Sequence, residues 1–195
     1  TGHFSEQIIE FTKTFPYFNY EFVHQKERLG LGHAINMACK DMDSPVLIIL
    51  GDSIFDLDYK SFVSGQTNQI GVSKVDKPER FGIVELNKKN EVIRLVEKPK
   101  NPPSNLAIAG IYQFQSEKIL KDTLEELIRC NIRTKNEYQL TDAMQMMLDN
   151  GESFQPFQIK NWFDCGLPET LITTNKLLLN IDINLISGTA EVSNS

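Results

Sequence analysis

The chain has 195 residues and a mass of 22.2 kDa, enough for one domain with a sizeable core but too little for two full domains. Twenty Lys and Arg residues against 26 Asp and Glu residues give a formal net charge of −6, which argues against binding to the nucleic-acid backbone through a dense basic face. The longest apolar run, 46–50, is too short to cross a bilayer, so no membrane contact is expected.

The three cysteines, Cys39, Cys130 and Cys165, are odd in number and widely spaced. They form neither a disulfide framework nor a paired zinc motif, which predicts a reducing, cytoplasmic compartment. No secretory signal is visible. Because the first residue is Thr1 and not Met, we expect the sequence to begin inside a longer polypeptide.

The first quarter of the chain predicts a helix, a strand, a second helix and a second strand. Ser5 is a candidate N-cap for a short helix, and residues 20–23 read as a strand. The glycines of 30–32 open a helix with apolar residues at helical spacing as far as Met42. Residues 45–50 are apolar throughout, which predicts a strand covered on both faces, as in a parallel sheet.

Strands and helices continue to alternate over the rest of the chain. A turn at 87–90 between two apolar segments predicts a hairpin. The expected elements are a strand at 68–75, the hairpin strands 81–86 and 91–96, a strand at 106–114, helices at 116–129 and 137–148, short strands at 154–159 and 162–163, and a helix from Pro168 to Leu179. This order predicts an α/β fold with a mixed, mainly parallel sheet and helices on both faces.

Two acidic residues are expected at the carboxyl ends of strands, where α/β sheets bind ligands. Asp52 follows the 45–50 strand and Asp164 follows the 162–163 strand, and each has a glycine beside it, Gly51 and Gly166. Two carboxylates from distant segments would make a hard-oxygen site suited to Mg²⁺. The alternative is that Asp52 is a turn residue and Asp164 a cap beside a helix.

Three shorter motifs have both a structural and a functional interpretation. Glu97-Lys98-Pro99 is either a solvated charged pair or a site where Lys98 binds phosphate and Glu97 accepts hydrogen bonds from sugar hydroxyls. Gly30-Leu31-Gly32 could present backbone N–H groups at a helix N-terminus to a base or phosphate. Asp56-Leu57-Asp58 matches the D-x-D pattern of metal-dependent glycosyltransferases, although Asp58 is better explained as the cap of a short helix at 59–63.

Seven segments, taken in order over residues 20 to 180, resemble the sugar nucleotidyltransferase (nucleotide-diphosphate-sugar pyrophosphorylase) family, and most closely the glucose-1-phosphate thymidylyltransferases. Each is weak alone, and their order makes the resemblance specific. They are Gln25 with Gly30-Leu31-Gly32; Gly51-Asp52-Ser53-Ile54-Phe55; Arg80-Phe81-Gly82-Ile83-Val84-Glu85; Glu97-Lys98-Pro99; Ala107-Ile108-Ala109-Gly110-Ile111-Tyr112; Glu137-Tyr138-Gln139-Leu140-Thr141-Asp142; and Trp162-Phe163-Asp164-Cys165-Gly166.

The resemblance implies a Rossmann-like fold that transfers a nucleotidyl group from a nucleoside triphosphate, with dTTP or UTP favoured, to a sugar-1-phosphate, with glucose-1-phosphate favoured. It implies Mg²⁺ as the cofactor. The implied roles are catalysis by Asp52, Lys98 and Asp164, with the two aspartates as metal ligands, and substrate binding by Gln25, Gly30, Gly82, Glu97 and Ile108.

The family's glycine-rich loop, G-x-G-x-R-x-x-P, does not occur here. Thr1-Gly2-His3 resembles the end of the family's second strand, so about fifty family positions are expected to precede it, and the fragment alone is expected to be inactive. The core is expected at 1–180 and a tail, a β-helix start or a linker, at 181–195. The alternatives are a non-catalytic nucleotide-sugar-binding or regulatory module of the same fold and a metal-dependent glycosyltransferase, and the sequence leaves homo-oligomerisation open.

Overall fold

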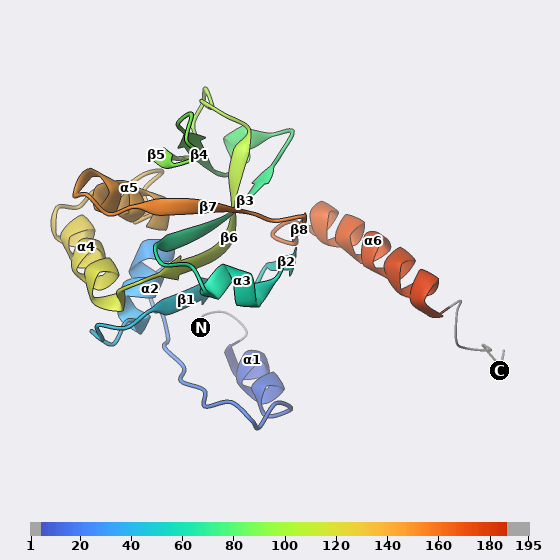
Figure 1. The fold of residues 1–195 in the computed structure, drawn as a ribbon. Helices are drawn as coiled ribbons and strands as arrows, with labels where there is room; N and C mark the ends of the chain where they lie inside the picture. The colour runs from blue at the N-terminus through green and yellow to red at the C-terminus, as the bar shows by residue number, and fades with distance from the viewer. Residues whose placement is uncertain (1–4, 187–195) are drawn as a thin grey trace.

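A computed structural model describes residues 5–186 of the chain, and the side chains of residues 5–179 (Figure 1). Helices and strands alternate, with one 3₁₀ turn. The elements are α1 (Ser5–Thr12), α2 (Leu31–Ala38), β1 (Val46–Ile49), β2 (Ser53–Asp56), α3 (Tyr59–Val63), β3 (Asn68–Lys74), η1 (Pro78–Arg80), β4 (Gly82–Leu86), β5 (Val92–Glu97), β6 (Leu106–Phe114), α4 (Glu117–Arg129), α5 (Leu140–Asp149), β7 (Phe154–Gln158), β8 (Asn161–Asp164) and α6 (Pro168–Ile186).

The strands form a six-stranded sheet and a two-stranded ribbon. The large sheet has the order β5-β4-β6-β3-β7, with β1 also paired to β6, and the ribbon consists of β2 and β8. Within the large sheet β6 pairs in antiparallel fashion with β1, β3 and β4, while β3 and β7 are parallel. The sheet is therefore mixed.

Strand β6 is the centre of the sheet, and it is buried along its whole length. One of its edges pairs with β3, so β4 and β1 share the other edge, β4 at Ala107 and β1 from Ile111 onward. Between these two pairings the backbone of Gly110 has φ +91° and accepts a hydrogen bond from Leu50 N–H at 2.9 Å. This interruption leaves a gap between the two strand pairings at 108–109.

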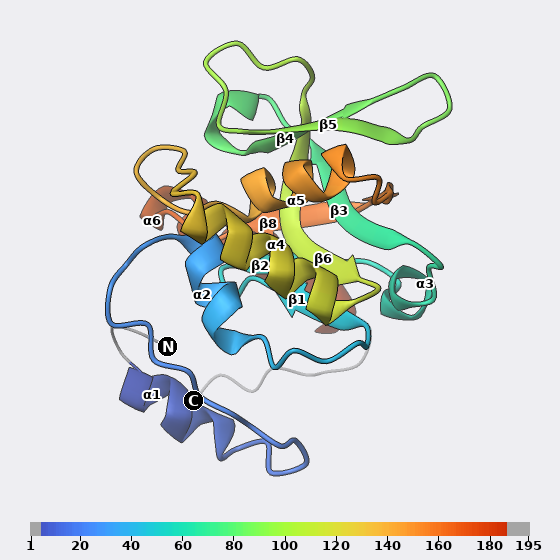
Figure 2. The ribbon, with the colours of Figure 1, turned by 90° about the vertical axis from the view of Figure 1, so that its left-hand side faces the viewer.

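Helices cover both faces of the sheet, as the sequence predicts. On one face α2, α4 and α5 pack over the main core (Figure 2), which includes Ile35, Leu124 and Met144. On the other face Phe62 of α3 packs with Ile111 of β6, and Trp162 of the β2–β8 ribbon lies against them. Helix α6 extends away from the sheets (Figure 1).

The pairing corrects the expectation of a mainly parallel sheet. Only β3 and β7 run parallel among the strands of the described chain, and the other pairs are antiparallel. The expectation rested on the apolar run 45–50, but β1 alternates between half-buried and exposed residues, with Leu47 and Ile49 exposed. The strand covered on both faces is β6, whose alternate side chains enter the two cores.

The structure also corrects several smaller expectations. The predicted strand 20–23 belongs to neither sheet within residues 5–186, and its Tyr20 and Phe22 are exposed. An apolar alternation becomes a strand only when a neighbouring strand completes its hydrogen bonds. Helix α2 ends at Ala38, four residues before Met42, and strand β2 at 53–56 was not predicted.

Helix α6 continues beyond the predicted end at Leu179 to Ile186, into the first residues of the expected tail. The expectations for Thr1-Gly2-His3 and for 187–195 lie outside the described residues. Across the described part of the chain, no helix combines the length and apolarity that crossing a bilayer requires.

Candidate active site

A pocket of about 630 Å³ opens beside this gap in the pairing of β6, between the large sheet and the β2–β8 ribbon. This volume is in the range of small-molecule sites. The carboxyl ends of three strands meet here, because Asp52 follows β1, Lys98 follows β5 and Asp164 ends β8. The ionisable side chains in its lining are Asp52, Glu79, Arg80, Glu97, Lys98, Tyr112, Lys135, Glu137 and Asp164.

The ribbon brings Asp52 and Asp164 together. Strands β2 and β8 are antiparallel, with Ser53 opposite Asp164, and Cys165 N–H donates to the Asp52 carbonyl at 2.8 Å. A Cβ atom placed on Gly166 would lie 3.1 Å from Asp164 Oδ1 and 3.4 Å from Asp52 Oδ2, so both carboxylates surround one point. A side chain at 166 would enter the space that the two carboxylates face.

The two aspartates fit a magnesium site that is completed by a ligand. Mg²⁺ commonly binds one or two protein carboxylates and takes its remaining oxygens from water and substrate phosphates. No cluster of three or more metal-binding side chains occurs among the described residues. Asp52 and Asp164 would therefore hold the ion together with phosphate groups, rather than enclose it.

Glu97 and Lys98 form the opposite side of the pocket. The Glu97 side chain is only 8% exposed; its Oε2 accepts a hydrogen bond from Thr141 Oγ1 at 2.7 Å, and its Oε1 lies 3.4 Å from Lys98 Nζ. Gly82 faces this group, because a Cβ there would lie 2.9 Å from Thr141 Oγ1 and 3.1 Å from Glu97 Oε2. The carboxylate is thus fixed in position at the pocket wall.

Tyr112, on the central strand β6, lies near both Asp52 and Glu97. Burial raises the pKa of the Tyr112 phenol above its ordinary value, and the nearby carboxylates of Glu97 and Asp52 raise it further. The phenol is therefore neutral across the physiological range. It can donate or accept a hydrogen bond in the pocket without adding charge.

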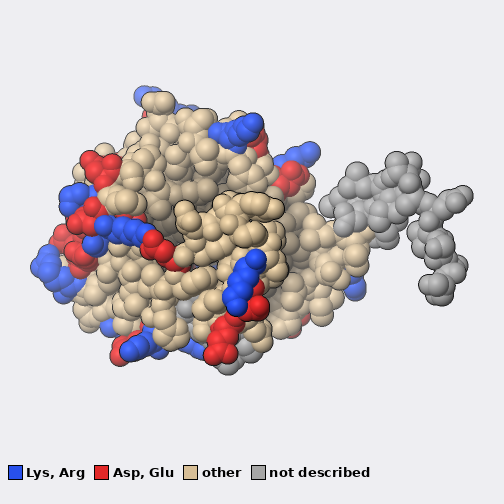
Figure 3. All heavy atoms as spheres, turned by 90° about the horizontal axis from the view of Figure 1, so that it is seen from below, with Lys and Arg blue, Asp and Glu red and all other residues tan. Residues whose placement is uncertain are grey.

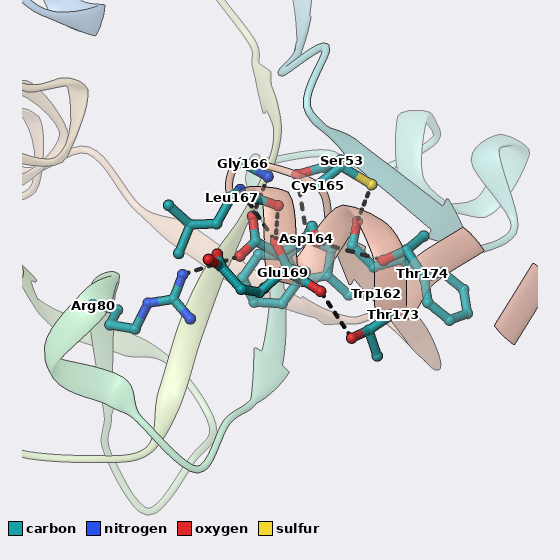
Figure 4. Close-up of polar contacts among 12 residues, drawn as sticks. Ser53, Arg80, Trp162, Asp164, Cys165, Gly166, Leu167, Glu169, Thr173 and Thr174 are labelled. Atoms are coloured by element: carbon teal, nitrogen blue, oxygen red, sulfur yellow. Dashed lines mark hydrogen bonds and ion pairs between the residues drawn. The ribbon is translucent and has the colours of Figure 1, made fainter. Parts of the chain in front are cut away.

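Arg80 spans the pocket from the large sheet to the ribbon. Its Nη2 lies 3.4 Å from Asp164 Oδ2, and Figure 4 shows the side chain reaching from its own loop toward that carboxylate. Its guanidinium also lies 5.2 Å from the centre of the Phe81 ring, and that ring meets Trp162 edge-to-face at 5.1 Å. The ribbon and the large sheet are thereby connected beside Asp164.

Six of the eight predicted site residues line this pocket. They are Asp52, Gly82, Glu97, Lys98, Ile108 and Asp164. The structure does not bring Gln25 and Gly30 into its lining, although Leu31 is there. Gln25 Nε2 donates to the Gly30 carbonyl at 3.2 Å. Gly30 itself packs tightly on Tyr138, because a Cβ atom placed on Gly30 would lie 2.6 Å from the Tyr138 carbonyl oxygen.

The sequence interpretation missed several residues of the pocket. Arg80, Lys135, Glu137 and Thr141 belong to the segments that carry the family resemblance or stand next to them, and that proximity was the available signal. Trp162, which belongs to the last of those segments, both packs against the smaller core and lines the pocket.

The D-x-D aspartates lie elsewhere. Asp58 caps α3 by accepting hydrogen bonds from Lys60 N–H and Ser61 N–H, and Asp56 accepts one from Asn161 at 2.8 Å. Neither residue lines the pocket. Both carboxylates are accounted for by structural hydrogen bonds, so the geometry gives no support to a glycosyltransferase site.

Comparison with known proteins shows the family of the chain. The family described as "Nucleotidyl transferase" matches residues 3–181. The chain belongs to the nucleotidyl transferase family. Among its relatives, the bifunctional protein GlmU of Methanococcus maripaludis strain C7 is 36% identical over 192 residues, which cover 97% of this chain and 45% of the relative. The UTP–glucose-1-phosphate uridylyltransferase AglF of Haloferax volcanii is 29% identical over 159 residues, which cover 76% of this chain and 62% of the relative.

Solved structures of other proteins have the same fold as this chain. A putative glucose-1-phosphate thymidylyltransferase from Bacillus anthracis superimposes with a TM-score of 0.72 and 25% identity, covering 89% of this chain and 71% of that one. A UDP-glucose pyrophosphorylase complexed with UDP-glucose gives a TM-score of 0.70 at 24% identity, a likeness of fold. This chain spans less than half the length of the GlmU relatives that it matches.

Proposed function

We propose that this chain transfers a nucleotidyl group from a nucleoside triphosphate to a sugar-1-phosphate, releasing pyrophosphate. The observation that carries the proposal is the convergence of Asp52 and Asp164 around one point of a pocket whose opposite wall is Glu97 and Lys98. One side suits a phosphate-bound divalent cation, and the other suits a phosphorylated sugar.

In the reaction, an oxygen of the sugar phosphate attacks the nucleotide α-phosphorus in line, and the bond to pyrophosphate breaks. The protein has to align two anions that repel each other and to balance the charge that develops at phosphorus. A magnesium ion, when bound, supplies a Lewis acid that neutralises phosphate charge. Asp52 and Asp164 are the residues that would hold it.

The remaining residues bind the substrates. Lys98 holds the sugar phosphate, and Glu97, oriented by Thr141, accepts hydrogen bonds from sugar hydroxyls. Gly82 and Ile108 shape the pocket beside the sugar. We keep the prediction that Gln25 and Gly30 read the base, supported by the position of Leu31, the neighbour of Gly30, in the pocket lining.

Among substrates we favour glucose-1-phosphate with UTP or dTTP. The supporting observations are relatives and neighbours named as a UTP–glucose-1-phosphate uridylyltransferase and a putative glucose-1-phosphate thymidylyltransferase. An exchange screen of the full-length protein, with four nucleoside triphosphates, several sugar phosphates and Mg²⁺, tests this choice. Binding without pyrophosphate release would favour a non-catalytic module instead.

Asp164→Asn is the sharpest test of the proposed site. Loss of a charged metal ligand should lower turnover in a pyrophosphate-release assay by about 100-fold or more. Asp58→Asn is the matched control, because asparagine keeps the α3 cap and the residue lies outside the pocket. Near-normal turnover in Asp164→Asn would remove that residue from the site, and an equal loss of turnover in Asp58→Asn would mean a general loss of folding rather than a specific effect on the site.

A further inference from the structure

Arg80 is the cation of the pocket that lies against the proposed metal-binding pair. Its Nη2 is 3.4 Å from Asp164 Oδ2, the carboxylate that also faces Gly166 and Asp52. The 3₁₀ turn η1 places it there, immediately before β4 begins at Gly82. Without a divalent cation, its positive charge partly neutralises Asp164.

This contact with Asp164 is weak and easily exchanged. The two groups share one hydrogen bond at the long end of the range, and the Arg80 side chain is 36% exposed. An ion pair of this kind adds little stability, because water competes for both charges. The guanidinium can therefore leave the carboxylate without a large loss.

The segment that carries Arg80, in contrast, is well anchored through its neighbour Phe81. The Phe81 carbonyl accepts a hydrogen bond from Lys98 N–H at 3.0 Å, which joins the start of β4 to the end of β5. The guanidinium lies over the Phe81 ring, which rests on Trp162 of the ribbon. The guanidinium that contacts Asp164 is therefore carried by a segment that is tied to both walls of the pocket.

The charge of the pocket calls for such a residue. Its lining carries the carboxylates of Asp52, Glu79, Glu97, Glu137 and Asp164, against three cations, Arg80, Lys98 and Lys135. A triphosphate adds further negative charge, and an arginine fork is well matched to phosphate oxygens. A cation held beside Asp164 stands where the phosphates of a metal–nucleotide complex would arrive.

We propose that Arg80 is a nucleotide-phosphate-binding residue that serves as a placeholder cation for Asp164 until a divalent cation arrives. With a divalent cation bound, Asp164 would be a ligand of that cation, and Arg80 would leave the carboxylate and take the nucleotide phosphates as its new partner. The exchange keeps Asp164 paired in both states. This inference rests on the proposed function and adds a residue to its nucleotide site.

The test compares Arg80→Ala and Arg80→Lys with wild type, by Mn²⁺ titration followed by electron paramagnetic resonance and by calorimetric titration of Mg²⁺ with UTP or dTTP, without sugar phosphate. Arg80→Ala should bind Mn²⁺ alone about two- to fivefold more tightly, since a partly exposed ion pair no longer competes. It should bind the metal–nucleotide complex about tenfold more weakly, as expected for a lost charge-assisted phosphate contact. Arg80→Lys should lie between wild type and Arg80→Ala in both measurements.

Arg129→Ala is the control, because Arg129 pairs with Glu126 at 2.8 Å on α4, outside the pocket. It should match wild type, and circular dichroism should show that every variant is folded. Wild-type affinities in Arg80→Ala would overturn the assignment, and weaker nucleotide binding with unchanged Mn²⁺ binding would overturn the placeholder role. A wild type that binds no triphosphate would overturn the proposed function itself, and the role of Arg80 with it.

Discussion

At the scale of single residues, Thr141 sets the position of Glu97. Its hydroxyl donates to Glu97 Oε2 at 2.7 Å from the first turn of α5, and both side chains are nearly buried. A buried carboxylate that loses a donor either moves or stays under-solvated. Thr141 therefore acts as a positioning residue for the proposed sugar contact.

Thr141→Val should weaken glucose-1-phosphate binding about tenfold, because valine keeps the shape but removes the donor. Thr141→Ser should bind like wild type, since the hydroxyl remains. Calorimetric titration measures both affinities. Thr123→Val is the control, because its hydroxyl donates only to the Ile119 carbonyl within α4. Equal losses of affinity in Thr141→Val and Thr123→Val would mean a general loss of stability rather than a specific effect on Glu97.

The sequence predicts those site residues whose position is determined by their neighbours in the chain. Asp52 and Lys98 come directly after apolar strand segments, so their place at a strand end can be inferred from neighbours in sequence. Arg80 and Thr141 lie in a 3₁₀ turn and at a helix start. Their direction toward the pocket depends on how those elements pack on the sheet, which no local pattern encodes.

At the scale of elements, the buried Glu117 joins helix α4 to the segment that leads into β1. Its two carboxylate oxygens accept hydrogen bonds from Lys40 N–H at 3.1 Å and Met42 N–H at 3.0 Å. The Glu117 N–H in turn donates to the Ser44 carbonyl at 2.9 Å. The start of β1, and with it Asp52 at its far end, is thereby fixed against the helix layer.

Glu117→Ala should lower the free energy of unfolding by about 3 kcal/mol, because two backbone N–H groups lose a charged acceptor. Glu117→Gln keeps one acceptor oxygen and should fall between Glu117→Ala and wild type. Urea unfolding followed by circular dichroism measures the difference. Asp122→Ala on the exposed face of the same helix is the control and should change stability by less than about 0.5 kcal/mol. A similar change in both variants would contradict the anchoring role.

The elements that the sequence predicts form hydrogen bonds within one segment of the chain, whereas the strands that it misplaces depend on hydrogen bonds to distant segments. Helix α4 is predicted by its apolar spacing, which is a local pattern, and the structure adds a local cap at Ser116. The apolar run 45–50 predicts a strand covered on both faces, but the strand that is covered on both faces is β6. Pairing direction and sheet position are set by distant neighbours, so composition alone could not separate the two.

At the scale of the whole molecule, the pocket lies between the large sheet and the β2–β8 ribbon, so its two walls come from different sheets. The ribbon contributes Asp164, and the large sheet contributes Glu97 and Lys98. The charges of the pocket are of both signs, and on the face seen in Figure 3 acidic and basic side chains are likewise interspersed. A ligand that contacts both walls should connect the ribbon to the sheet more firmly than Arg80 does.

Ligand binding should therefore stabilise the entire fold. With Mg²⁺ and the preferred triphosphate at 100 times Kd, mass action contributes about 2.7 kcal/mol. For a chain of this size that raises Tm by about 5–10 °C in a thermal unfolding scan. Hydrogen exchange should slow most in β8 and in the η1–β4 segment, because these carry Asp164 and Arg80 from opposite walls.

Asp164→Asn should lose most of this Tm shift, whereas Asp58→Asn should keep it, since only Asp164 lies in the pocket. Protection confined to the ribbon would mean that the nucleotide binds one wall alone. A full Tm shift in Asp164→Asn would place the nucleotide away from the aspartate pair. The first result would mean that the two walls do not act together on the nucleotide, and the second would mean that the pocket has to be assigned to another ligand.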